Sequence, residues 1–104
     1  MSFPTIPFES TAGTYRGGDF LCFRVGTCEG LWRSASDAYE ILAVVNHQRG
    51  NGHFKEAMLW FEQSCRRDRK ALLVREVWNP RLALMLRRNG FKWDGWFNWR
   101  KTFV

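Results

Sequence analysis

The fold of this 104-residue chain is decided by the stretch Arg49-Gly50-Asn51-Gly52-His53-Phe54. It follows an apolar, strand-like run at 39–45 and leads into an amphipathic run at 54–66. Two glycines between a strand and a helix let the backbone come close to an anion, and the first helical N–H groups then point at that anion. Arg49 adds a positive charge. The alternative is a plain tight turn, because Gly-x-Gly alone is a weak signal.

The run after the glycines has the spacing of a helix that packs on a sheet. One side of it carries positions at i, i+3, i+4, i+7 and i+8, which are Ala57, Trp60, Phe61, Ser64 and Cys65. This period is typical of an amphipathic helix. A second apolar run at 71–78 follows. Strand, helix and strand together predict a βαβ unit with parallel neighbouring strands.

A second helix is predicted from its two ends. Asn79 suits the N-cap, Pro80 suits the first helical position, and Gly90 suits the left-handed position after the last turn. Its expected buried stripe consists of Leu82, Met85 and Leu86.

These two segments resemble the GCN5-related N-acetyltransferase (GNAT) superfamily. The first is similar to the family's Arg-x-x-Gly-x-Gly/Ala acyl-CoA loop, with Phe54 where the family has its second small residue. The second is similar to the family's strand, Asn, short helix and Gly-Phe signature, with Asn79, Gly90 and Phe91 at the family's spacing. The resemblance covers roughly residues 38–91, the expected acyl-CoA-binding core.

The resemblance implies one α+β domain (α/β three-layer type) over residues 1–104, with a GNAT-like mixed sheet around the parallel βαβ unit. The region before that unit is shorter than in typical relatives, and residues 1–18 are expected to be an irregular or partly extended arm. Its possible anchors are Phe3, Ile6 and Phe8.

Antiparallel hairpins are expected on both sides of the central unit. Strands at 19–25 and 31–34 flank a turn at 26–30. At the C-terminus, Asp94-Gly95 predicts a β-hairpin whose return strand begins at Trp96. This aromatic and basic ribbon can stack on nucleic-acid bases, or it can be a strand clamped between helices or a dimer contact.

The resemblance also implies a cofactor site for acetyl-CoA. Its pyrophosphate would be held by the loop residues Arg49, Gly50, Asn51, Gly52, His53 and Phe54. Backbone groups of Val44 and Val45 would receive the pantetheine and the thioester carbonyl, and Asn79 would contact the pantetheine arm. The capping role of Asn79 and a surface position for His53 are the simpler alternatives.

Glu40 is the candidate general base. It is the only carboxylate on the strand at 39–45, and strict alternation puts it on the same face as Leu42 and Val44. An ordinary strand-end charge is the alternative. Many GNAT enzymes have a tyrosine in the short helix that protonates the departing thiolate. This chain has Leu86 at that position, so water would have to protonate the thiolate.

Charge and cysteine content limit the remaining possibilities. Residues 1–48 carry three basic and five acidic residues, whereas residues 49–104 carry thirteen and five. The basic half suits the phosphates of CoA or of a nucleic acid, unless it is only a solvated helix surface. The three cysteines lack metal or disulfide spacing, and no metal site is expected. No signal peptide or membrane-length apolar run is found, which favours the cytoplasm.

The expected activity is therefore acetyl transfer from acetyl-CoA to an amine of a protein or small molecule, by a homodimer. The short N-terminal region would leave sheet edges and apolar surface uncovered. This motivates the homodimer, with the C-terminal hairpin at its interface. One alternative is a GNAT-fold binding, inhibitory or structural module without chemistry, of a kind that some bacteriophages encode. A nucleic-acid-binding protein is the other.

Overall fold

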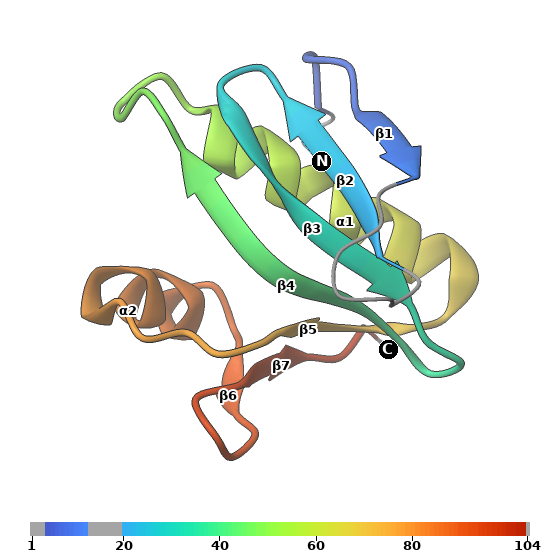
Figure 1. Cartoon of the computed structure of the whole chain (residues 1–104). Helices are drawn as coiled ribbons and strands as arrows, with labels where there is room; N and C mark the ends of the chain where they lie inside the picture. Colours follow the sequence, from blue (N-terminus) through green and yellow to red (C-terminus); the bar gives the residue numbers. More distant parts are fainter. Residues whose placement is uncertain (1–3, 13–19, 104) are drawn as a thin grey trace.

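The computed structural model describes residues 4–12 and 20–103, which form one mixed seven-stranded sheet and two helices (Figure 1). The sheet order is β1-β2-β3-β4-β5-β7-β6. All neighbouring strands are antiparallel except β4 and β5, which are parallel and joined through α1. The predicted α+β class with a mixed sheet is thereby confirmed. The elements are β1 (Glu9–Ala12), β2 (Leu21–Val25), β3 (Cys28–Ser34), β4 (Ala38–Asn46), α1 (His53–Asp68), β5 (Ala71–Val74), α2 (Pro80–Arg88), β6 (Lys92–Trp93) and β7 (Trp99–Lys101).

Helix α1 packs along one face of the sheet and closes the main core (Figure 1). Ala57, Phe61 and Cys65 of the predicted stripe are buried. The ring of Phe61 lies 5.0 to 5.7 Å from three other aromatic rings. We call this group the inner aromatic cluster: Phe8, Phe23, Trp32 and Phe61.

The N-terminal arm is only partly irregular. Its residues 9–12 form β1, which pairs with β2, while residues 4–8 have no regular structure. Ile6 and Phe8 pack against the core as predicted, and the indole N–H of Trp60 donates to the Ile6 carbonyl at 2.6 Å. Phe3 lies outside the described residues.

A β-bulge in β4 changes which side chains share a face. Neighbouring residues Leu31 and Trp32 of β3 pair with Ala43 and Ile41, so Leu42 is an extra residue on β4. Ile41 and, after the bulge, Val44 both pack on the core that α1 covers. The prediction that Glu40 and Val44 share a face is therefore wrong, because strict alternation stops at the bulge.

Strands β4 and β5 separate after a short parallel pairing. The ladder runs from Ala38–Ala71 to Ile41–Val74, and its last bond joins the Arg75 N–H to the Ile41 carbonyl at 2.9 Å. The chain then bends at Glu76, which has a left-handed φ of 53°. The strand predicted at 71–77 thus ends early, and no strand among the described residues pairs with this edge of β4 beyond Ile41.

Helix α2 has the ends that the sequence predicted. The Asn79 side chain accepts a hydrogen bond from the Arg81 N–H at 2.9 Å, and Pro80 begins the helix. Gly90 has a φ of 91°, and the next N–H reaches back to the Leu86 carbonyl at 3.0 Å. Of the predicted stripe, Leu86 is buried and Leu82 half-buried, whereas Met85 is exposed because it borders a cavity.

The C-terminal hairpin has a wider turn than predicted. Its return strand begins at Trp99, and Trp96 and Phe97 lie in the turn with φ of 50° and 59°. The expected strand start at Trp96 is wrong, because these backbone angles are incompatible with a strand. A second group of rings, the outer aromatic cluster, forms here: Trp78, Trp93, Phe97 and Trp99.

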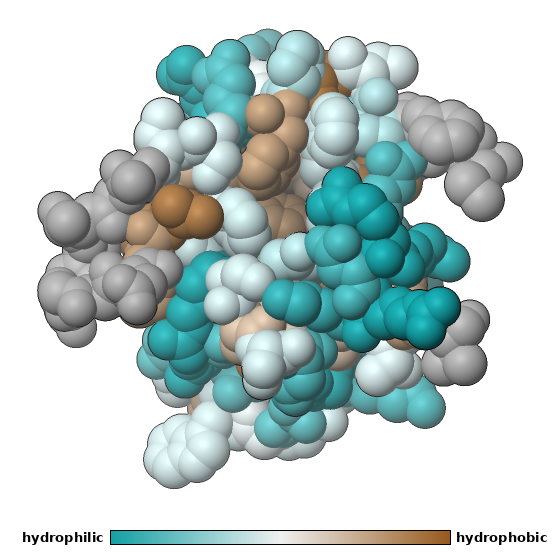
Figure 2. Space-filling model, turned by 90° about the vertical axis from the view of Figure 1, so that its right-hand side faces the viewer, coloured by the Kyte–Doolittle hydropathy of each residue, from teal (hydrophilic) through white to brown (hydrophobic). Residues whose placement is uncertain are grey.

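One face of the described structure is largely hydrophilic or neutral (Figure 2). On the face drawn in Figure 2, hydrophilic and neutral residues cover most of the described surface, and hydrophobic ones form a narrow strip. Within residues 4–12 and 20–103, no helix is long and apolar enough to cross a membrane.

Candidate functional site

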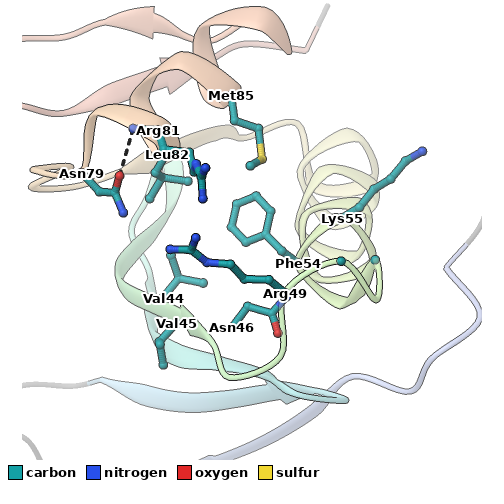
Figure 3. Close-up of a pocket in the computed structure, with 12 residues that line it drawn as sticks. Val44, Val45, Asn46, Arg49, Phe54, Lys55, Asn79, Arg81, Leu82 and Met85 are labelled. Atoms are coloured by element: carbon teal, nitrogen blue, oxygen red, sulfur yellow. Dashed lines mark hydrogen bonds between the residues drawn. The ribbon is translucent and has the colours of Figure 1, made fainter.

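A cavity of about 470 Å³ lies where the N-terminal ends of α1 and α2 meet the end of β4 (Figure 3). Seven of the nine predicted cofactor-binding residues line it, and Asn51 and His53 do not. Glu40, the predicted base, does not line it either. The lining residues are Val44, Val45, Asn46, Arg49, Gly50, Gly52, Phe54, Lys55, Asn79, Arg81, Leu82 and Met85.

The two glycines of the loop shape its mouth. Gly50 and Gly52 have φ of 80° and 79°, a left-handed conformation that other residues adopt with strain. A Cβ added at either position would meet no atom within 4 Å, so the loop backbone faces open space. A ligand can therefore approach the backbone closely, as the sequence predicted.

The N-terminus of α1 offers free N–H groups. Its N-cap is Gly52, which has no side chain to cap the helix. The His53 N–H is bound by the Asn51 side-chain oxygen at 3.0 Å, which leaves the N–H groups of Phe54 and Lys55 available for a ligand. These groups and the helix dipole favour an anion at this end.

The side chains of Asn51 and His53 hold the loop against the β2–β3 turn. His53 Nδ1 accepts a hydrogen bond from the Thr27 N–H at 2.8 Å, and Asn51 Nδ2 donates to the Thr27 hydroxyl at 2.7 Å. Gly26 is required beside them, because a Cβ there would collide with the His53 ring. Both side chains support the loop, and their predicted contact with a phosphate stays a prediction.

Three cations and no carboxylate are found among the twelve residues that line the cavity. The guanidinium groups of Arg49 and Arg81 extend toward each other across it, whereas the Lys55 side chain points away (Figure 3). Two helix N-termini add partial positive charge. The cavity is therefore strongly electropositive and suited to an anionic group.

Arg81 was missed in the sequence, although a signal exists. It lies in the first turn of α2, where no acidic residue is present. A cation at the positive end of a helix is unfavourable, so its presence there indicates a partner beyond the helix. Lys55 and Asn46 were also missed, and no comparable signal marks them.

The inner part of the cavity is apolar and leads toward the gap between the diverging strands. Val44, Leu82 and Met85 line that part, and Asn79 adds a polar amide. A second cavity of about 280 Å³ lies between β4 and β5 and shares the walls Val44, Asn79 and Leu82. A long ligand with an anionic head and a slender arm fits this shape, with its tip at the gap.

Glu40 has a different environment from the one predicted. Its side chain is 9% exposed and lies between two guanidinium groups, Arg33 at 2.8 Å and Arg75 at 3.3 Å. These two partners explain why a carboxylate can be buried here. Its role as a general base stays a prediction, and within the fold its carboxylate joins β3 to the residue that follows β5.

The buried thiols are poor nucleophiles. Burial raises the pKa of the Cys28 thiol to about 11 and that of Cys65 to about 12. Both are therefore protonated near neutral pH, and neither lines the cavity. Cys22, the exposed thiol, lies on β2.

No protein-family model, curated protein or solved structure matches this chain. The case for a function therefore depends on the cavity, its charges and the strand geometry beside it.

Proposed function

We propose that this protein is an acetyl-CoA-dependent N-acetyltransferase that binds acyl-CoA in the 470 Å³ cavity. One observation supports this above the others. Two helix N-termini and the guanidinium groups of Arg49 and Arg81 converge on a cavity without a carboxylate in its lining. Such a cavity suits the pyrophosphate of CoA.

The rest of the cofactor would follow the shape of the cavity. The free N–H groups of Phe54 and Lys55 would bind phosphate oxygens, with Arg49 and Arg81 as ionic partners. The pantetheine arm would pass Asn79 and Leu82 and bring the thioester to the gap beside β4. Beyond Ile41, no strand among the described residues pairs with β4 on that side, so its N–H groups there would be available to polarise the carbonyl.

The transfer needs an amine on the far side of the gap, where the 280 Å³ cavity lies. The protonated amine gives up one proton to a base, and its nitrogen attacks the thioester carbon. The new C–N bond forms as the C–S bond breaks, and the second nitrogen proton goes to the departing sulfur or to water. Glu40, acting through water, is the proposed base, and Leu86 supplies no proton.

A second candidate function is a GNAT-fold module that binds a partner without catalysing transfer. The ion pairs of Glu40 with Arg33 and Arg75 favour it, because they occupy the proposed base. So does Leu86, which is buried and has no proton to donate. An acceptor screen with acetyl-CoA separates the two: product above the uncatalysed rate excludes the module.

Two further parts of the proposal concern the cellular compartment and the oligomeric state. The three cysteines are unpaired, which suits the reducing cytoplasm, where we place the activity. We also propose a homodimer, although the positive charge of the C-terminal hairpin makes that hairpin a poor interface between two copies. Sedimentation at micromolar concentration tests it, and a monomer there would contradict it.

The cofactor proposal is tested by thermal unfolding and calorimetric titration with acetyl-CoA and with CoA. At about 100 times its Kd, a ligand adds roughly 2.7 kcal/mol, enough to raise Tm by several degrees. Arg81→Gln should remove most of this shift. Arg88→Gln is the matched control, since it neutralises an exposed arginine at the other end of α2. No shift with the unsubstituted protein, or equal losses in the two variants, contradicts the proposal.

A further inference from the structure

Exposed apolar surface is concentrated in one part of the chain. Of the seven large hydrophobic side chains that are exposed among the described residues, six lie between residues 78 and 97. Three are tryptophans, with exposed fractions of 64% for Trp78, 54% for Trp93 and 84% for Trp96. Clustered exposed aromatic rings usually mark a binding surface.

The turn that carries Trp96 is held by hydrogen bonds. The Asp94 N–H donates to the Asn98 carbonyl at 2.8 Å, and the Val77 N–H donates to the Phe97 carbonyl at 2.7 Å. Asn98 also accepts the Glu76 N–H at 2.9 Å through its side chain. The turn is thus fixed to the segment that follows β5.

The same turn is strained. Trp96 and Phe97 are consecutive, bulky and left-handed, a conformation that such residues rarely adopt. Strain of this kind persists where the surroundings enforce it, and it is most frequent at functional sites. Here it keeps Trp96 in solvent, where it stabilises no core.

The segment that carries the rings is rich in positive charge. Residues 75–104 contain seven basic and two acidic residues, and four of the six tryptophans of the chain. On the hairpin, Lys92 pairs with Arg100 and Trp93 with Trp99, so the two cations lie on one face and the two rings on the other, and both faces meet at the edge strand β6. One of the two acids, Asp94, forms an ion pair with Arg100 at 3.3 Å.

We propose that this surface binds single-stranded nucleic acid, separately from the 470 Å³ cavity proposed for acyl-CoA; Trp78 alone is shared with the 280 Å³ cavity. Bases stack on the exposed rings of Trp78, Trp93 and Trp96, and Lys92 and Arg100 contact phosphates. Exposed aromatic rings among cations are the features that bind single strands with little sequence preference. A second copy of this chain is a poorer occupant, because two basic surfaces would repel each other.

The first test is fluorescence anisotropy with labelled thymidine and uridine oligonucleotides of about 20 nucleotides and the full chain. Binding at about 50 mM salt should weaken steeply by about 200 mM, with a slope of about −0.7 per phosphate contact. The two oligonucleotides separate DNA from RNA as the source. Absence of binding to both at about 50 mM salt overturns the proposal.

Variants test whether the oligonucleotides bind to this surface. Trp96→Ala should raise the Kd about tenfold, while Trp96→Phe keeps a ring and most of the affinity. Lys92→Gln should lower the salt slope by about 0.7. Arg24→Gln is the matched control and should leave the salt slope unchanged. Arg24 lies on β2, which is five strand positions from β6, roughly 24 Å across the sheet.

Two results overturn the assignment even if the oligonucleotides bind. One is equal affinity of Trp96→Ala and the unsubstituted protein. The other is sedimentation that shows a dimer which Trp96→Ala dissociates, because the rings then contact a second copy. These readouts do not depend on acetyl-CoA, so the two proposals can fail separately.

Discussion

The inner and outer aromatic clusters contain the same kinds of ring but have opposite surroundings. Phe23 and Phe61 of the inner cluster are almost completely buried beneath α1, with their ring centres 5.0 Å apart. In the outer cluster, Trp78 and Phe97 lie 4.0 Å apart and remain exposed. Aromatic contact alone therefore does not make a core.

The difference comes from what covers each cluster. The inner one is enclosed by a helix on one side and a wide sheet on the other, so its rings leave water on folding. The outer one lies on a hairpin at the edge of the sheet, next to the short helix α2 (Figure 1). We expect the inner cluster to supply stability and the outer one to supply binding.

The strongest check of this division compares one truncation in each cluster. Phe61→Ala should lower the free energy of unfolding by about 3 to 5 kcal/mol, because it leaves a cavity among packed rings. Trp93→Ala should cost about 1 kcal/mol or less, since its ring is half in water. Urea unfolding measures both. Similar losses would mean that the outer cluster is also a core.

Alkaline pH should lower the free energy of unfolding, because two buried thiols belong to the core that contains the inner cluster. Burial raises the pKa of Cys28 to about 11 and that of Cys65 to about 12, above the value near 8.5 of an unfolded chain. The neutral thiols therefore contribute fully below about pH 8.5, and their contribution is lost as pH rises toward 11 and 12. Each can remove up to about 1.4 kcal/mol per pH unit in that window.

Unfolding measured between about pH 8 and 10.5 checks this loss. Cys65→Ala should reduce the pH dependence, whereas Cys22→Ala, at an exposed thiol, should not. A pH dependence that is the same in both variants would contradict the assignment.

At the start of α2, Asn79→Ala should lower stability by about 1 kcal/mol, within the usual range of about 0.5 to 2 for a lost N-cap. Asn79→Ser keeps an oxygen that can accept the Arg81 N–H and should recover most of this loss. Thermal unfolding measures the three proteins. If Ser is no better than Ala, the cap contributes little and the amide of Asn79 has another role.

The smallest effect has the opposite sign. Trp96→Gly should raise stability by about 0.5 to 1 kcal/mol, because glycine adopts a left-handed φ without strain. The same change at Trp93, which lies in a strand, should lower stability. Calorimetric Tm values distinguish the two signs. A loss of stability in Trp96→Gly would show that this ring is part of the packing and contradict its role as a binding surface.

Local features of the fold were predictable from the sequence. The period of α1, the cap at Asn79 and the left-handed glycines each depend on residues within one or two turns of each other. The same holds for the loop at 49–54, whose glycines and following helix turn fix its open backbone. For this reason seven of the nine expected cofactor residues lie around one cavity.

Features that depend on distant partners were not predictable. The bulge at Leu42 exists only in the pairing of β4 with β3, and it moves Val44 to the other face from Glu40. The charge of Glu40 is balanced by Arg33 of β3 and by Arg75, which directly follows β5. No pattern along β4 itself contains this information.

The sequence by itself determined the order of the central elements, the two ends of α2 and the open backbone of the glycine loop, because short-range backbone rules govern these. Only the tertiary structure decided that Arg81 enters the cavity, that Asn51 and His53 turn away from it, and that Trp96 stays in water. Each of these depends on which surfaces meet once the sheet has formed. That is set by the packing of segments far apart in the chain, and it cannot be derived from neighbouring residues.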